Sequence, residues 1–201
     1  MKNTPLHFWN ERYSQKEFIY GTKPNTFFKS ELDKLKPGSI LLPAEGEGRN
    51  AVYAAKKNWS VTAFDMSKSG KEKAMLLSKQ NKVSIDYKVT GALEYTNNKQ
   101  FDAIGMCYSH FPANIRKKAN QHILRFLKQG GTLIFESFAK GQLKNTSGGP
   151  KNEAMLFSIE EIKAEFPGLE FSILEEKTIA LSEGTLHIGE AQVIRFVGVK
   201  I

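Results

Sequence analysis

Residues 39–65 read SILLPAEGEGRNAVYAAKKNWSVTAFD, and this stretch decides the fold. It begins with the apolar run Ile40–Leu42, turns through Glu45–Gly48, and continues with the apolar spacing of a helix. A second run, Val61–Phe64, is rich in β-branched and aromatic residues and ends at Asp65. Strand, glycine turn, helix, strand and acidic residue in this order are typical of a nucleoside-binding βαβ unit. We expect Asp65 to bind both hydroxyls of a ribose, because it follows the carboxyl end of the second strand.

The charges in the glycine turn favour one kind of nucleoside over another. Gly46-x-Gly48-x-x-Ala51 fits the dinucleotide fingerprint, but Glu45 and Glu47 would place two carboxylates beside a pyrophosphate, which is unfavourable. A ligand that carries an ammonium and a sulfonium group, such as S-adenosylmethionine, would instead be attracted. The alternative is that both glutamates point into solvent, as glutamates in loops usually do.

The rest of the chain predicts an α/β fold with a doubly wound, mostly parallel sheet. Further strands are expected at 83–89, 101–107 and 132–135, with helices from Ser67 to Ser78, from Pro112 to a stop at Gly130-Gly131, and from Ile159 to Phe166 behind a Ser158 capping box. The runs 169–181 and 191–199 have no helix between them, so they predict an antiparallel hairpin joined by 182–190. A closing hairpin argues against a nicotinamide dehydrogenase. The long irregular segment 139–152 is a candidate lid over a substrate.

The first 36 residues are helical in pattern and rich in aromatic side chains. The segment 21–24 divides them, and Asn25 or Thr26 is placed to cap the second helix. Two interpretations are compatible with this pattern: a helical flap over a ligand, or a helix that only covers the sheet. We therefore expect one domain over residues 1–201, with a flap at 1–36 and a Rossmann-like core at 37–201.

Composition limits the classes of function. The chain has 201 residues, a net charge of +8 and one cysteine, Cys107, so no internal disulfide forms and a reducing compartment, the cytoplasm, is expected. No apolar run is long enough for a membrane span. We expect the lysines and the run Arg116-Lys117-Lys118 to lie on solvated helix faces, with a weak attraction for anionic substrates or RNA as the alternative. No metal site is expected, and the protein is expected to be a monomer or homodimer.

Several motifs together resemble a known family. They are Trp9-x-x-Arg12-Tyr13, Tyr20-Gly21-Thr22-x-Pro24-Asn25, Gly46-Glu47-Gly48-Arg49-Asn50-Ala51, Asp65-Met66-Ser67, His110-x-Pro112, Gly130-Gly131 and Gly148-Gly149-Pro150. With these motifs the whole chain resembles the class I S-adenosylmethionine-dependent methyltransferases. More narrowly, it is similar to the small bacterial methyltransferases grouped with tellurite-resistance and thiopurine methyltransferases. The resemblance implies the sheet order 3-2-1-4-5-7-6, with strand seven antiparallel.

The resemblance also implies the roles of individual residues. The expected cofactor-binding residues are Trp9, Tyr20, Glu45, Gly46, Glu47, Gly48, Arg49, Asn50, Asp65, Met66, Ser67, Ala92, Leu93, Cys107 and Tyr108. Residues 45–48 would hold the methionine part, Asp65 the ribose, and Ala92 with Leu93 the adenine. Tyr20 would cover the cofactor, while Cys107 and Tyr108 would line the sulfonium. The chain departs from the family pattern at 42–45, where an acidic residue and a first glycine are usual, and at 90–93, where an aspartate is common.

The methyl acceptor is left open by the sequence. A thiol or a metalloid oxyanion needs no strong base, whereas a small phenol needs one, and His110 is the best-placed candidate. The alternative for His110 is a structural role, and Glu136 and His187 are weaker candidates. Three functions remain open: a small-molecule methyltransferase, which is favoured, an RNA methyltransferase, and a non-catalytic cofactor-binding module. We expect no nucleic-acid partner, since residues 1–201 contain no segment that the sequence predicts to be a separate RNA-binding domain.

Overall fold

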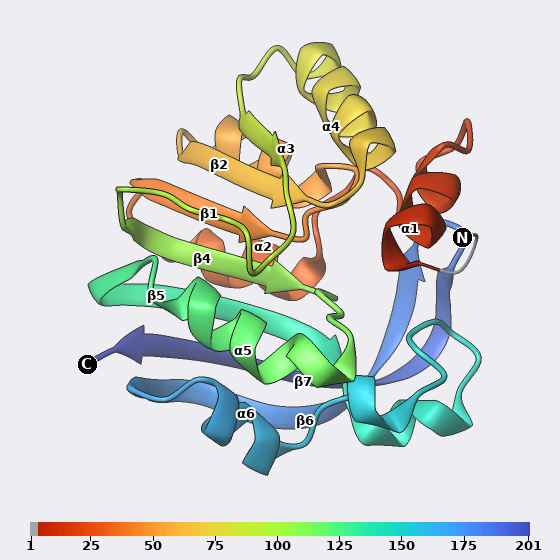
Figure 1. The fold of residues 1–201 in the computed structure, drawn as a ribbon, viewed down its shortest axis with the longest axis vertical. Coiled ribbons are helices and arrows are strands. Elements are labelled where there is room, and N and C mark those ends of the chain that lie inside the picture. The colour runs from red at the N-terminus through yellow and green to blue at the C-terminus, as the bar shows by residue number, and fades with distance from the viewer. Residues whose placement is uncertain (1–3) are drawn as a thin grey trace.

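The computed structural model describes residues 4–201, and one seven-stranded sheet forms its centre (Figure 1). The strands are β1 Ser39–Pro43, β2 Ser60–Asp65, β3 Asp86–Val89, β4 Phe101–Cys107, β5 Leu127–Phe138, β6 Leu169–Glu183 and β7 His187–Lys200. Their order is β3-β2-β1-β4-β5-β7-β6, with β7 antiparallel to both of its neighbours and the other pairs parallel. The Rossmann-like methyltransferase sheet expected from the sequence is confirmed.

Helices cover both faces of the sheet, because successive residues of a strand point to opposite sides. Ile40 and Leu42 pack with α2, α3 and α4 on one face, whereas Leu41 packs with α5 and α6 on the other. The helices are α1 Pro5–Tyr13, α2 Thr26–Leu32, α3 Arg49–Lys56, α4 Lys68–Gln80, α5 Ala113–Leu124 and α6 Ile159–Glu165. Among the described residues, no helix combines the length and the apolar character that crossing a membrane requires.

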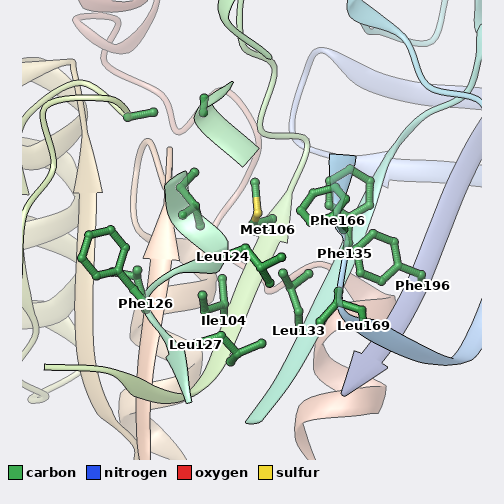
Figure 2. Packing of buried hydrophobic residues seen from close by; sticks show 14 of the residues in the cluster. Ile104, Met106, Leu124, Phe126, Leu127, Leu133, Phe135, Phe166, Leu169 and Phe196 are labelled. Carbon is green, nitrogen blue, oxygen red and sulfur yellow. The ribbon is translucent and has the colours of Figure 1, made fainter. Parts of the chain in front are cut away.

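The central strands are buried on both faces, which explains their continuous apolar runs. On the α5–α6 side, Ile104 and Met106 of β4 lie beside Leu133 and Phe135 of β5, and all four are fully buried (Figure 2). Phe135 also stacks on Phe196 of β7 at 4.9 Å between ring centroids, so the core continues into the antiparallel part of the sheet.

The N-terminal region forms the two expected helices, but they lie in different places. Asn25 caps α2, since its side chain accepts a hydrogen bond from the Phe28 N–H at 2.8 Å. Helix α1 lies off the sheet, at the edge where β1 and β4 end (Figure 1). The Asn10 side chain ties α1 to the start of α4 by accepting hydrogen bonds from the Ser67 hydroxyl at 2.8 Å and the Ser69 N–H at 3.3 Å.

Several element boundaries differ from the expected ones. Helix α5 ends at Leu124 instead of at Gly130-Gly131, and both glycines lie inside β5, which starts at Leu127. The cause is an early pairing: the Phe101 N–H donates to the Phe126 carbonyl at 2.8 Å, which begins the β4–β5 ladder directly after the helix. Strand β3 starts only at Asp86, and the hairpin strands extend to a short turn at 184–186.

The expectation that the basic run 116–118 lies on a solvated helix face is wrong for Arg116, which is buried. Its guanidinium donates to the Glu165 carboxylate at 2.9 and 2.6 Å and to the Leu156 carbonyl at 2.6 Å. The side chain is buried because it joins α5, α6 and the short 3₁₀ helix Glu153–Met155. The Ser158 capping box of α6 is confirmed, and the segment after β5 contains a second 3₁₀ helix, Lys140–Lys144.

Candidate active site

A cavity of about 940 Å³ opens at the edge of the sheet where β1 and β4 end. Its walls come from segments that are far apart in the sequence: α1, Tyr20 and Gly21, the glycine turn, the residues after β4, the segment 149–155, and His187 of the hairpin. Ligands of doubly wound folds bind at this edge, where the strand order reverses. The cavity is therefore the candidate site.

The expected cofactor residues divide into two groups. Those that line the cavity are Trp9, Tyr20, Glu45, Glu47, Arg49, Asn50, Cys107 and Tyr108, together with the candidate base His110. Those that do not are Gly46, Gly48, Asp65, Met66, Ser67, Ala92 and Leu93. Most of the residues expected around the methionine part and the sulfonium thus line one cavity, although Gly46 and Gly48 do not, and the residues expected around the adenosine lie outside it.

The glycine turn brings backbone close to neighbouring elements. Gly46 and Gly48 have φ of 59° and 85°, a region that side chains rarely adopt. A Cβ on Gly48 would lie 2.5 Å from the Ala74 Cβ, so this glycine also permits the close packing of α3 on α4. Ala44 has a φ of 49° where the family usually has glycine. Strained residues of this kind concentrate at functional sites, and Ala44 lines the cavity.

Glu45 caps the helix that follows the glycine turn. Its carboxylate accepts a hydrogen bond from the Ala51 N–H at 2.7 Å, at a helix start where the N-cap residue, Gly48, has no side chain to offer. Burial raises the pKa of Glu45 to about 7, although the hydrogen bond from Ala51 and the charge of Arg49 oppose the rise. No ion pair satisfies this carboxylate within residues 4–201. Glu45 is therefore available to form an ion pair with a positively charged group of a ligand.

The Glu47 carboxylate is bound by other residues of the protein. Its carboxylate accepts hydrogen bonds from the N–H groups of Ile19 and Tyr20 at 3.2 and 3.3 Å, and it forms a 2.7 Å ion pair with Lys73. The Thr185 N–H in turn donates to the Ile19 carbonyl at 2.9 Å. Residues 19–21 are thus a strap, held between the glycine turn and the hairpin turn, so this part of the expected flap is tied down in the structure.

Asp65 lies next to the cavity without reaching it. Its two carboxylate oxygens accept hydrogen bonds from the Gly46 N–H at 3.1 Å and the Ser67 N–H at 2.8 Å, and only 6% of the residue is exposed. Burial raises the pKa of Asp65 to about 6, although those two hydrogen bonds act to lower it. Tyr13 lies against Gly46 and lines the cavity. Tyr13 therefore lies beside the Gly46–Asp65 hydrogen bond.

The residues after β4 form the opposite wall. Tyr108 has a φ of 53°, and its hydroxyl donates to the Glu136 carboxylate at 3.0 Å. Glu136 is buried beneath the site, where it also accepts a 2.6 Å hydrogen bond from the Asn25 amide, and it does not line the cavity. Burial raises the pKa of Cys107 well above its usual value, so its side chain is a thiol. Cys107 therefore presents a small apolar group to the cavity and is no nucleophile.

His110 is a neutral imidazole on the cavity wall. Both ring nitrogens are buried, and neither has a partner in the part of the chain that the structure describes. The ring stacks on Phe138 at 5.7 Å between centroids, and burial lowers its pKa to about 4. An unpartnered imidazole on a cavity wall is a group that a ligand would satisfy.

Arg12 is a functional candidate that residue patterns did not single out for a role. Its guanidinium lies 4.3 Å from the centroid of the Phe8 ring and donates to the Tyr20 hydroxyl at 2.9 Å. It lines the cavity, and no carboxylate pairs with it over residues 4–201. The Trp9-x-x-Arg12 spacing was the available signal, since it places both residues on one side of a helix.

No group of His, Cys, Asp and Glu that could hold a metal occurs among the described residues.

Comparisons with known proteins agree with this fold. Residues 40–131 match a family model described as "Methyltransferase domain". No curated protein matches the chain at the level of sequence.

Solved structures share the fold over nearly the whole chain. Magnesium protoporphyrin IX methyltransferase (ChlM) from Synechocystis, with bound SAH, has a TM-score of 0.73 at 14% identity, over 98% of this chain and 97% of that one. TehB from Haemophilus influenzae has a TM-score of 0.72 at 13% identity, over 98% and 67%. A structure described as "Conversion of a Disulfide Bond into a Thioacetal Group during Echinomycin Biosynthesis" has a TM-score of 0.80 at 14% identity, over 98% and 92%. At such identities the likeness is one of fold.

Proposed function

We propose that the chain is an S-adenosylmethionine-dependent methyltransferase that acts on a small molecule. The observation that carries the proposal is Glu45, a half-buried carboxylate without an ion pair among residues 4–201, on the wall of a cavity at the ends of β1 and β4. An ammonium group supplies the charge that such a carboxylate lacks. The match of residues 40–131 to a methyltransferase domain supports S-adenosylmethionine as the cofactor.

The charges of the cavity fit the methionine part of this cofactor at both ends. Glu45 would bind the ammonium group, and Arg12 would bind the carboxylate, because its guanidinium has no acidic partner over the described residues. Cys107 and Tyr108 would lie beside the sulfonium. The cofactor supplies the methyl group, and the chain's own contribution is to hold it in line with the acceptor and to exclude water.

The adenosine part would bind at the neighbouring edge of the cavity. Asp65 would accept hydrogen bonds from the ribose, and Ala92 with Leu93 would contact the adenine. Since Tyr13 lies against Gly46 at this point, α1 must shift when the cofactor binds. Movement of a covering element on binding is common in enzymes that shield their chemistry from water. Helix α1 would then be a flap that moves, while the strap of residues 19–21 stays in place.

A small-molecule acceptor is supported by the narrow set of segments that line the cavity, which include α1, His187 and the segment 149–155. The candidate classes are thiols, metalloid oxyanions and small phenols, and His110 is a candidate base for a phenol. The narrower likeness to the tellurite-resistance and thiopurine methyltransferases, which the sequence motifs indicate, belongs to the same proposal.

Calorimetry with S-adenosylmethionine and with NAD tests the cofactor. We expect S-adenosylmethionine to bind and NAD not to bind, because a pyrophosphate would meet Glu45 and Glu47. We also expect affinity to be about tenfold weaker at pH 5.5 than at pH 7. The pKa of Glu45 is about 7, so below that value the carboxyl must lose a proton before it can pair with the ligand's ammonium.

Glu45→Gln is the matched control, since glutamine keeps the shape of the side chain and cannot ionise. In this variant the affinity should be lower at pH 7, and Glu45's share of the pH dependence should disappear. Binding of NAD together with no binding of S-adenosylmethionine would reject the proposed cofactor. A pH dependence that is identical in the variant would reject the role of Glu45.

A further inference from the structure

The hairpin turn brings two ionisable side chains together at the cavity, Glu183 and His187, and the second of them lines it. In the β6–β7 register, Glu183 lies opposite His187, and the turn between them contacts the strap. Gly184 has a φ of 61°, and a Cβ there would lie 2.1 Å from the Ile19 carbonyl oxygen, so the turn depends on glycine for this close approach. His187 is 4% exposed and lines the cavity.

The contacts of His187 fix its tautomer. Its Nδ1 lies 3.3 Å from Glu183 Oε2, and Arg49 Nη2 donates to the same oxygen at 2.9 Å. Burial would raise the pKa of Glu183, but the hydrogen bond from His187 and the charge of Arg49 outweigh it and hold that pKa below its usual value. A carboxylate only accepts hydrogen bonds, so Nδ1 carries the hydrogen and Nε2 has the free lone pair.

His187 is also neutral in the free protein. Burial lowers its pKa, and the raising effect of Glu183 does not cancel this. The charged groups that face it are Glu183 from β6, Arg49 from α3 and Arg12 from α1, while His110 acts from across the cavity. The imidazole is therefore a base whose neighbouring carboxylate would stabilise it once it is protonated, an arrangement familiar from enzymes that use a carboxylate–histidine pair.

The surroundings of His187 suit a flat acceptor. Its ring centroid lies 4.6 Å from those of Tyr20 and Tyr108, and 5.4 Å from that of Phe138. Aromatic walls favour planar, largely apolar ligands. Of the two guanidinium groups that face His187, Arg49 pairs with Glu183, and Arg12 is the residue assigned to the carboxylate of the cofactor. With the cofactor bound, neither of these two groups is left for an oxyanion such as selenite, whereas a neutral hydroxyl would find the lone pair of Nε2.

We infer that His187, oriented by Glu183, accepts the proton of a neutral, planar hydroxyl compound of the phenol class as that compound is methylated. The inference deepens the proposed function and rests on it. As the acceptor oxygen bonds to the methyl carbon, the carbon–sulfur bond breaks and its electron pair stays on sulfur. The hydroxyl proton moves to His187 Nε2, and the resulting imidazolium is paired with Glu183 before the proton passes to solvent. Glu183 is a positioning residue, because it acts through His187.

His110 is the competing base, and the geometry favours His187. No carboxylate orients His110, and its ring nitrogens have no partner within residues 4–201. Its pKa of about 4 makes it the weaker proton acceptor near neutral pH. We assign to His110 a hydrogen bond to the bound acceptor.

Nitrogen-15 NMR of the histidine side chains tests the orientation of His187. The chain has four histidines, so single His→Gln variants assign the spectrum. With S-adenosylhomocysteine bound near pH 7, we expect His187 to be neutral, with hydrogen on Nδ1 and none on Nε2. In Glu183→Gln the population with hydrogen on Nε2 should rise. His122, whose Nε2 lies 2.8 Å from the Tyr95 carbonyl outside the cavity, should be unchanged. A protonated His187, or hydrogen on Nε2 in the unmodified protein, would overturn the inference.

Methyl transfer from S-adenosylmethionine to phenol, thiophenol and selenite tests the acceptor class. We expect transfer to phenol, and His187→Gln should lower kcat for phenol by about 100-fold or more while S-adenosylmethionine affinity stays within twofold. Transfer to thiophenol, which ionises readily, should be affected much less, and His122→Gln should resemble the unmodified protein. Transfer to selenite alone, or an unchanged kcat for phenol in the variant, would refute the role of His187. Failure of the unmodified protein to bind S-adenosylmethionine would instead refute the proposed function.

Discussion

Replacing Arg116 by alanine should lower the free energy of unfolding by about 3–5 kcal/mol. Arg116 is only 5% exposed, and it is the cationic partner that the buried Glu165 carboxylate contacts most closely. Without it, Glu165 would retain a single hydrogen bond from the Asn120 amide at 2.7 Å. The carbonyl oxygens of Ala154 and Leu156 would lose their donor as well. Urea denaturation followed by circular dichroism measures the change.

An exposed ion pair provides the matched control. Lys128 and Asp102 are 2.6 Å apart, but their side chains are 46% and 43% exposed, so Lys128→Ala should cost at most about 1 kcal/mol. Arg116→Lys should fall between the two, because an ammonium group cannot reach Glu165 Oε1 and the carbonyl oxygens of Ala154 and Leu156 as the guanidinium does. Equal losses in Arg116→Ala and Lys128→Ala would show that Arg116 is not the anchor of this region.

Replacing Asp65 by alanine should affect both stability and cofactor affinity. The N–H groups of Gly46 and Ser67 would lose their acceptors inside the protein, which costs about 1–3 kcal/mol for each. The proposed hydrogen bonds to the ribose would be lost too, so S-adenosylmethionine should bind about 10- to 100-fold more weakly. Denaturation and calorimetry on the same preparation separate the two effects.

Asp65→Asn should lose less of both quantities, because an amide oxygen still accepts one of the two backbone hydrogen bonds. Denaturation and calorimetry can each contradict a different part of this prediction. An alanine variant with unchanged stability would contradict the hydrogen bonds of the glycine turn. One that loses stability but keeps its affinity would show that Asp65 only holds the turn and does not touch the ribose.

The sequence predicted the parts of the fold that depend on local pattern. The stretch 39–65 contains its own strand, turn and helix signals, and the lack of a helix between 169 and 199 was enough to predict the hairpin. The end of α5 was missed because Gly130-Gly131 is a common helix stop, whereas pairing with Phe101 had already begun the next strand. Long-range pairing overrode a local signal there.

The partners of charged residues could not be predicted from pattern. Glu47 and Glu45 are two positions apart in one turn, yet Glu47 pairs with Lys73 and Glu45 has no ion pair in the part of the chain that is described. Arg116 was assigned to a solvated face because two lysines follow it, while its partner Glu165 lies 49 positions away. Glu183 was overlooked because only the hairpin register places it opposite His187. Each of these depends on tertiary contacts.

The most direct test of the proposed function is to locate the methyl group of bound S-adenosylmethionine. With the cofactor labelled with carbon-13 in its methyl group, isotope-filtered NMR detects the protons of the chain that lie next to it. We predict nuclear Overhauser effects from this methyl group to the Tyr108 ring and to the Cys107 side chain. A second cavity, whose lining includes Ile179 and Leu181, shares no lining residue with the candidate site, and effects confined to it would contradict the proposal. So would a complex in which the methyl group contacts neither Cys107 nor Tyr108.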